Sequence, residues 1–116
     1  MTRYLISFDH GAMDHIPDEE LPDVRDASLA VIRDARDAGV WVFAGGVYPD
    51  DEIRPSVVAT DGTVTDAPER MPYIAGVTII DVPSREEALR WAARLAAACR
   101  CPQEVREFAA DPAVGN

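Results

Sequence analysis

The sequence predicts an α+β domain with the ferredoxin-like split β-α-β arrangement and a β-hairpin inserted at its centre. The first observation is the order of apolar patterns along the 116 residues, which alternate between strand-like and helix-like spacing. The second is an Asp-Gly pair between two β-rich runs, a strong hairpin signal. The third is a capping-box sequence before an amphipathic stretch, which predicts a helix start. We expect one domain over residues 1–116, with four main strands in the sheet order 4-1-3-2.

The first half of the chain predicts a strand, a helix and a second strand. Residues 3–8 are β-rich and alternate only loosely, as expected of a central strand with both faces covered. Residues 22–38 carry apolar residues three and four positions apart, follow acidic residues that favour a helix start, and end at a glycine. Residues 40–47 form another β-rich run. Its pair Gly45-Gly46 marks a bulge or a close approach to the backbone, by a ligand or by packing.

The central segment, residues 49–72, is rich in Pro and Asp and predicts an insertion that carries its own small hairpin. Asp61 and Gly62 would form the turn of this hairpin. Residues 73–82 follow as the longest apolar strand candidate in the chain. We therefore expect them to form a central strand of the sheet.

The last third predicts a helix, an edge strand and a tail. Ser84 begins the capping box, and one apolar stripe then continues to Cys99. Residues 104–108 are charged enough to discourage further pairing, as expected of an edge strand, and residues 109–116 are typical of a loose tail. Cys99 and Cys101 are too close for an easy disulfide, so we expect reduced, partly buried thiols.

The composition excludes several partners and chemistries. A formal net charge of -10 repels phosphate backbones, and the 11 basic residues are scattered, so we expect no nucleic-acid partner. All of them are Arg, and the absence of Lys excludes a Schiff-base lysine, a pyridoxal phosphate anchor and a P-loop. No apolar run approaches the roughly 20 residues that span a bilayer. Because residues 1–7 also lack a secretory signal pattern, we expect a cytoplasmic protein without membrane contact.

The predicted topology brings polar residues to one rim of the sheet. In the 4-1-3-2 order the third strand runs antiparallel to the first and second, so the ends of those two strands and the start of the third share a rim. Loops that converge at one end of a sheet are where a site for a small organic molecule is expected. The candidate residues at this rim are Asp9, His10, His15, Tyr48, Asp66, Glu69, Arg70 and Tyr73.

His10 is the main candidate for acid-base catalysis, because imidazole titrates near neutral pH and His10 directly follows the first predicted strand. Asp9 or Asp66 would set its protonation as a catalytic partner, and Glu69 is a further carboxylate that could orient it. We assign Glu69 and His15 to substrate binding. The alternative is a solvated loop whose Asp residues form turns.

Two tyrosines and an arginine complete the predicted site. Tyr48 and Tyr73 would donate hydrogen bonds to an oxyanion, and Arg70 would pair with a substrate carboxylate. The alternative is that the tyrosines are packing residues with a wet hydroxyl and that Arg70 offsets local negative charge. A metal site would require His10, His15 and a carboxylate, but the spacing of the histidines fits neither one helix face nor a known ligand motif. We therefore predict no metal site and no cofactor.

One face of the predicted sheet has no cover. The two helices cover the opposite face, so residues such as Leu5 and several of residues 74–82 would lie on the uncovered one. An apolar sheet face in water would be a large exposed patch. We therefore expect a second copy of the chain to pack against it, giving a homodimer.

Several segments occur in a characteristic order and spacing. They are residues 3–8, 38–40 leading to 45–46, 61–69, 75–82 and 87–92. Together they resemble the YCII-related (YciI-like) proteins, particularly the branch with an Asp-Gly-Pro-Phe (DGPF) motif, over most of residues 3–108. The resemblance implies a dimeric α+β barrel. It also implies a His and an Asp in a cleft that act on small molecules, as proposed for enzymes of this family.

The chain departs from the family pattern where its chemistry would lie. Residues 66–69 keep the Asp and Pro of the motif but replace its Gly and Phe, so the turn there should differ. The first predicted helix contains no histidine, where the other branch carries one. After the second helix, Cys101-Pro102 takes the place of that branch's Asp-Pro. The His/Asp pair of the other branch is therefore not transferred to this chain.

The sequence thus favours a homodimer that binds a small organic molecule and uses His/Asp acid-base chemistry as a lyase, isomerase or dehydratase. A non-catalytic dimer that senses a ligand or binds a partner protein fits the acidic surface equally well. A monooxygenase-like enzyme on the same fold is a third alternative, because a fold does not fix the chemistry.

Overall fold

The computed structural model describes residues 1–70 and 72–115, which form a small α+β domain with a four-stranded antiparallel sheet. The strand order is β2-β5-β1-β6, which confirms the predicted order of the four main strands. Each neighbouring pair in the sheet is antiparallel. The strands of the sheet are β1 (Thr2–Asp9), β2 (Trp41–Gly46), β5 (Ile74–Val82) and β6 (Glu104–Glu107).

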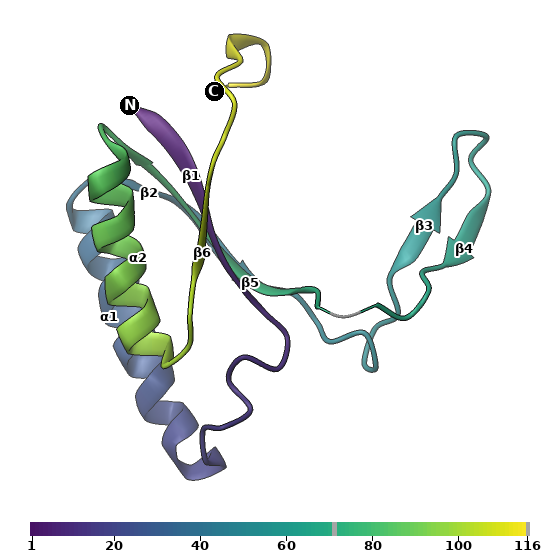
Figure 1. The fold of residues 1–116 in the computed structure, drawn as a ribbon, viewed down its shortest axis with the longest axis horizontal. Coiled ribbons are helices and arrows are strands. Elements are labelled where there is room, and N and C mark those ends of the chain that lie inside the picture. The colour runs from purple at the N-terminus through teal and green to yellow at the C-terminus, as the bar shows by residue number, and fades with distance from the viewer. Residues whose placement is uncertain (71, 116) are drawn as a thin grey trace.

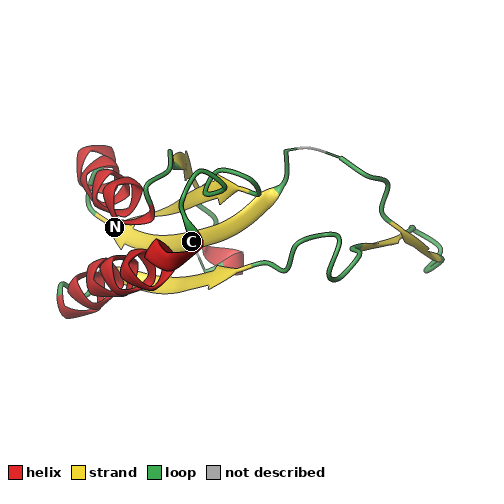
Figure 2. Cartoon of the chain, turned by 90° about the horizontal axis from the view of Figure 1, so that it is seen from below, coloured by secondary structure: helices red, strands yellow, loops and turns green. Residues whose placement is uncertain are grey.

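Two helices, α1 (Leu21–Asp37) and α2 (Arg85–Cys99), cover one face of this sheet (Figures 1 and 2). A short 3-10 turn, η1 (Asp18–Glu20), leads into α1. The predicted cap of α2 is present, since the Ser84 hydroxyl accepts a hydrogen bond from the Glu87 N–H at 3.2 Å.

The hydrophobic core lies between the helices and the covered face of the sheet. Ile6, Ile80 and Val82 are at most 1% exposed and pack with helix residues such as Ala88 and Leu95. Burying each of these large side chains stabilises the fold by about 1.5–3 kcal/mol relative to leaving it in water. The alternating residues of the strands point to the opposite face, which neither helix covers.

The predicted insertion is a hairpin of β3 (Ser56–Val58) and β4 (Val64–Asp66). Its turn is the predicted one: the Asp61 carboxylate accepts the Thr63 N–H at 2.9 Å, a bond that lowers the pKa of Asp61, and Gly62 has a φ of +89°. The hairpin, residues 56–66, extends away from the sheet, and we call it the arm (Figures 1 and 2).

The chain ends beyond β6 in a segment that is not wholly irregular. Residues Pro112–Val114 form the short 3-10 turn η2, capped by the Asp111 carboxylate, which accepts the Ala113 N–H at 3.0 Å. Among residues 1–70 and 72–115, no helix combines the length and the apolar character needed to cross a membrane.

Candidate functional site

The rim predicted from the topology brings the ends of β1 and β2 beside the start of β5. The His10 N–H, directly after β1, donates to the carbonyl of Tyr73 at 2.8 Å. On the other side of β5, the Val47 N–H donates to the carbonyl of Ala75 at 2.8 Å. These backbone bonds continue the strand pairing past the ends of the strands, so they hold His10 and Tyr73 in register.

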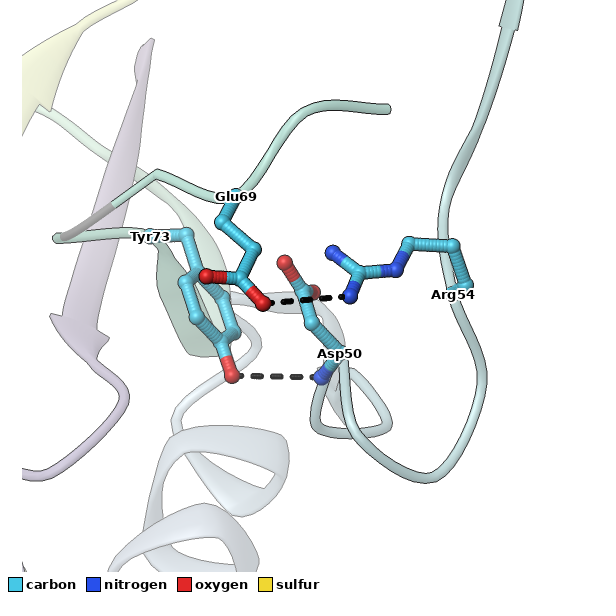
Figure 3. A network of polar contacts seen from close by, with 4 residues as sticks. All are labelled: Asp50, Arg54, Glu69 and Tyr73. Carbon is cyan, nitrogen blue, oxygen red and sulfur yellow. Dashed lines mark hydrogen bonds and ion pairs between the residues drawn. The ribbon is translucent and has the colours of Figure 1, made fainter. Parts of the chain in front are cut away.

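The rings of His10 and Tyr73 stack on one another at this rim. Their centroids are 5.0 Å apart and their planes differ by 10°, so the contact is a parallel one. The phenol oxygen of Tyr73 also accepts the N–H of Asp50 at 3.1 Å (Figure 3). Tyr73 thus contacts the first limb of the insertion, by which we mean residues 49–55, between β2 and β3. The side chains of His10 and Tyr73 are both half-buried.

A hollow of about 260 Å³ opens beside this stack, and we call it the rim hollow. Its charged walls come from the base of the arm, where the Arg54 guanidinium lies 3.6 Å from the Glu69 carboxylate (Figure 3). The Glu69 side chain is 90% exposed, so this ion pair is screened and contributes little to stability. The residues that line the rim hollow are His10, Asp50, Asp51, Arg54, Glu69, Arg70 and Tyr73.

Four of the residues predicted from the sequence therefore line one hollow: His10, Glu69, Arg70 and Tyr73. Asp50, Asp51 and Arg54 also line it but are not among the residues predicted from the sequence. They lie between β2 and β3, on the first limb of the insertion, where the carbonyl of Pro49 accepts the N–H groups of residues 52 and 53, both at 3.0 Å, and forms a turn. The Pro/Asp-rich composition of that limb was the available signal.

The other four predicted residues do not line the rim hollow. Asp9 is the last residue of β1 and pairs with Ile74. Asp66 pairs with Ser56 within the hairpin of β3 and β4. Because this hairpin extends away from the sheet, Asp66 is not among the residues of the rim hollow. His15 lies exposed in the loop after β1, and Tyr48 is 65% exposed.

The His10 ring has no carboxylate partner within the parts of the chain that the structure describes: no side-chain hydrogen bond or ion pair involves it there. Its stacked neighbour Tyr73 and the backbone bond of its own N–H are what fix its position. The carboxylates that line the rim hollow together with His10 are those of Asp50, Asp51 and Glu69. Across residues 1–70 and 72–115, no three His, Cys, Asp or Glu side chains are grouped to hold a metal ion.

The two cysteines are free and buried, in agreement with the expected reduced thiols. Burial, followed by the charge of nearby Cys101, raises the pKa of the Cys99 thiol to about 11. Burial also raises the pKa of Cys101, opposed by a hydrogen bond from Gln103. Both thiols are therefore protonated at neutral pH, which makes them poor nucleophiles.

Comparison of the chain with models of known protein families and with curated proteins finds no match.

Proposed function

We propose that the protein is a homodimer that binds a small organic molecule in the rim hollow and that His10 moves a proton on this molecule. The observation that supports the proposal best is the stack of His10 on Tyr73 beside a hollow with two arginines and three carboxylates. A planar group entering the hollow would meet an imidazole held in place by its neighbour. Arg54 and Arg70 supply donors for a carboxylate or carbonyl oxygen of the ligand.

The chemistry follows from the donors and acceptors of these groups. The Tyr73 oxygen accepts the Asp50 N–H, so its own O–H remains able to donate to an oxygen on which negative charge develops. His10 would take a proton from the ligand carbon next to this oxygen-bearing group or return it, since an imidazole can act as a general base and as a general acid. Proton abstraction next to a carbonyl is the first step of many lyases, isomerases and dehydratases, the reaction types that we assign.

Binding is testable before the substrate is known. Titration of the ¹⁵N-labelled protein with pyruvate, acetoacetate and 4-hydroxybenzoate should shift the amides of Asp50 and Arg54 for at least one compound. His10→Ala should weaken that compound's binding about tenfold, which corresponds to about 1.4 kcal/mol. His15→Ala is the matched control and should leave it unchanged, because His15 is exposed outside the hollow. Equal weakening by both variants would contradict the assignment.

Two apolar surfaces support the homodimer. Leu5 and Phe43 both pair with Ile79, on the face of the sheet that the helices leave open, and Phe43 is 53% exposed. The arm presents further aliphatic side chains, among them Val64 at 62% exposure. A two-stranded hairpin alone is only marginally stable in water, so an arm that no helix covers gains from packing on another chain. A second copy of the chain could cover both the open sheet face and the arm. Two such sheet faces packed together would form the α+β barrel.

Sedimentation equilibrium tests the dimer. The wild-type chain should sediment at twice its mass of 12.6 kDa, and Phe43→Glu should shift the equilibrium towards the monomer. Leu89→Glu is the matched control, because Leu89 is similarly exposed but belongs to α2 on the other side of the sheet. A wild-type monomer, or equal dissociation of both variants, would contradict the proposal.

The non-catalytic alternative, a dimer that senses a ligand or binds a partner protein, is favoured by one observation: the His10 ring has no carboxylate bonded to it in the described chain. It predicts the same binding in the rim hollow without turnover. Proton exchange on the bound compound distinguishes the two functions.

A further inference from the structure

A second cavity of the protein is larger than the rim hollow. It has a volume of about 470 Å³ and lies between α1 and the covered face of the sheet, where it shares no residue with the rim hollow. This volume is within the range of about 300–1,000 Å³ that small-molecule sites occupy. Its walls are mostly apolar and include Phe8 after the middle of β1, Val24, Leu29 and Ile32 on α1, and Ala44 on β2.

The cavity is open because β2 carries almost no side chains where it passes beneath α1. Ala44 contributes one methyl group, and Gly46 contributes none. A Cβ atom at Gly46 would meet a single atom within 4 Å, the carbonyl oxygen of Ala75 at 3.6 Å, so there is space for a larger residue. Gly46 pairs with Gly76, which pairs in turn with Phe8, so all three residues lie on the covered face. The absence of a side chain at Gly46 therefore helps to keep the cavity open.

The mouth of the cavity is apolar with a single charge. Leu21 and Leu29 of α1 line it although they remain 40% and 42% exposed to solvent, so the cavity opens to the outside along α1. Arg25 is the one charged side chain among its lining residues. Within residues 1–70 and 72–115, Arg25 forms no ion pair, although the chain has a net charge of -10. Cys99 lines the inner wall as a neutral thiol.

We propose that this cavity binds an amphipathic monocarboxylic acid, with its hydrocarbon part between α1 and β2 and its carboxylate at Arg25. An unpaired guanidinium at the edge of an apolar space matches the two parts of such a molecule. A second negative charge would lie in apolar surroundings without a partner, which is why a monoacid is favoured over a diacid.

The probe is octanoate, with 1-octanol as its uncharged counterpart. In ¹⁵N spectra, octanoate should shift the amides of Ser28, Ala44 and Gly46. Arg25→Gln should weaken octanoate about tenfold and change 1-octanol less than twofold. Arg33→Gln, an exposed arginine of α1 that does not line the cavity, is the matched control and should change neither.

Two substitutions fill the cavity independently, so a variant that fails to fold does not end the test. Gly46→Val and Ala44→Leu should each abolish the shifts caused by octanoate and by 1-octanol, with folding checked by circular dichroism. His10→Ala should leave octanoate binding unchanged, which separates this site from the rim hollow. The proposal is overturned if octanoate causes no shifts at α1 and β2, if Arg25→Gln and Arg33→Gln behave alike, or if the folded filled variants bind as the wild type does.

Discussion

Loss of the hydrogen bond from the Asp50 N–H to the Tyr73 oxygen should have a measurable local effect, because this bond joins the first limb of the insertion to the residue that precedes β5. Tyr73→Phe removes this acceptor and leaves a ring that can still stack on His10. A neutral hydrogen bond contributes about 0.5–1.5 kcal/mol. Asp50 is half-buried, so water can replace part of the lost bond, and we expect a cost of about 1 kcal/mol.

Hydrogen exchange of single amides measures this cost with a control inside the same molecule. A local cost of about 1 kcal/mol corresponds to roughly fivefold faster exchange of the Asp50 amide in Tyr73→Phe. The His10 amide should keep its exchange rate, because its acceptor is the backbone carbonyl of residue 73, which the substitution retains. Unchanged exchange at Asp50 would refute the reasoning. Equal acceleration at Asp50 and His10 would show a global loss of stability instead.

Three further predictions concern the stability of the fold. Ile80→Ala should lower the free energy of unfolding in urea by about 2–5 kcal/mol because it leaves a cavity in the core, whereas Leu89→Ala, half-exposed on α2, should cost much less. Ser84→Ala removes the cap of α2 and should cost about 1 kcal/mol in the same assay, and no loss would contradict the cap. Because burial raises the pKa of Cys99 from 9.0 to about 11, the stability that this thiol contributes is fully present below about pH 9 and is lost as the pH rises through about 11. The urea midpoint should therefore fall less steeply over this range in Cys99→Ala than in the wild type.

The fold could be predicted because its determinants are local. The spacing of apolar residues located both helices, Ser84 marked the start of α2, and Asp61-Gly62 marked the turn of the hairpin. That order of elements is the one of the split β-α-β arrangement, from which the strand order was predicted. The direction in which the hairpin extends depends on contacts that no local pattern encodes.

The difference between local patterns and long-range contacts also explains which residues of the candidate site could be predicted. His10 and Tyr73 lie together because strand pairing carries them there, and pairing was predictable. Asp66 was expected beside His10, but it lies on β4, within the extended arm. Asp50 came to the rim hollow through the turn after Pro49, a detail of backbone hydrogen bonding. Gly46 was the sequence signal for the cavity between α1 and the sheet. The volume of that cavity could not be predicted, because it depends on how α1 packs above β2.

Proton exchange in D₂O tests the assignment of His10 most directly, since it detects proton transfer without knowledge of the complete reaction. ¹H spectra of pyruvate, acetoacetate and related keto acids should show protein-catalysed loss of the proton next to the carbonyl for a compound that binds the rim hollow. General acid-base catalysis contributes about 10²–10⁴-fold, so His10→Ala should slow this exchange at least a hundredfold while His15→Ala leaves it unchanged. Exchange no faster than in buffer, or a loss of no more than a few-fold in His10→Ala, would contradict a catalytic role for this residue.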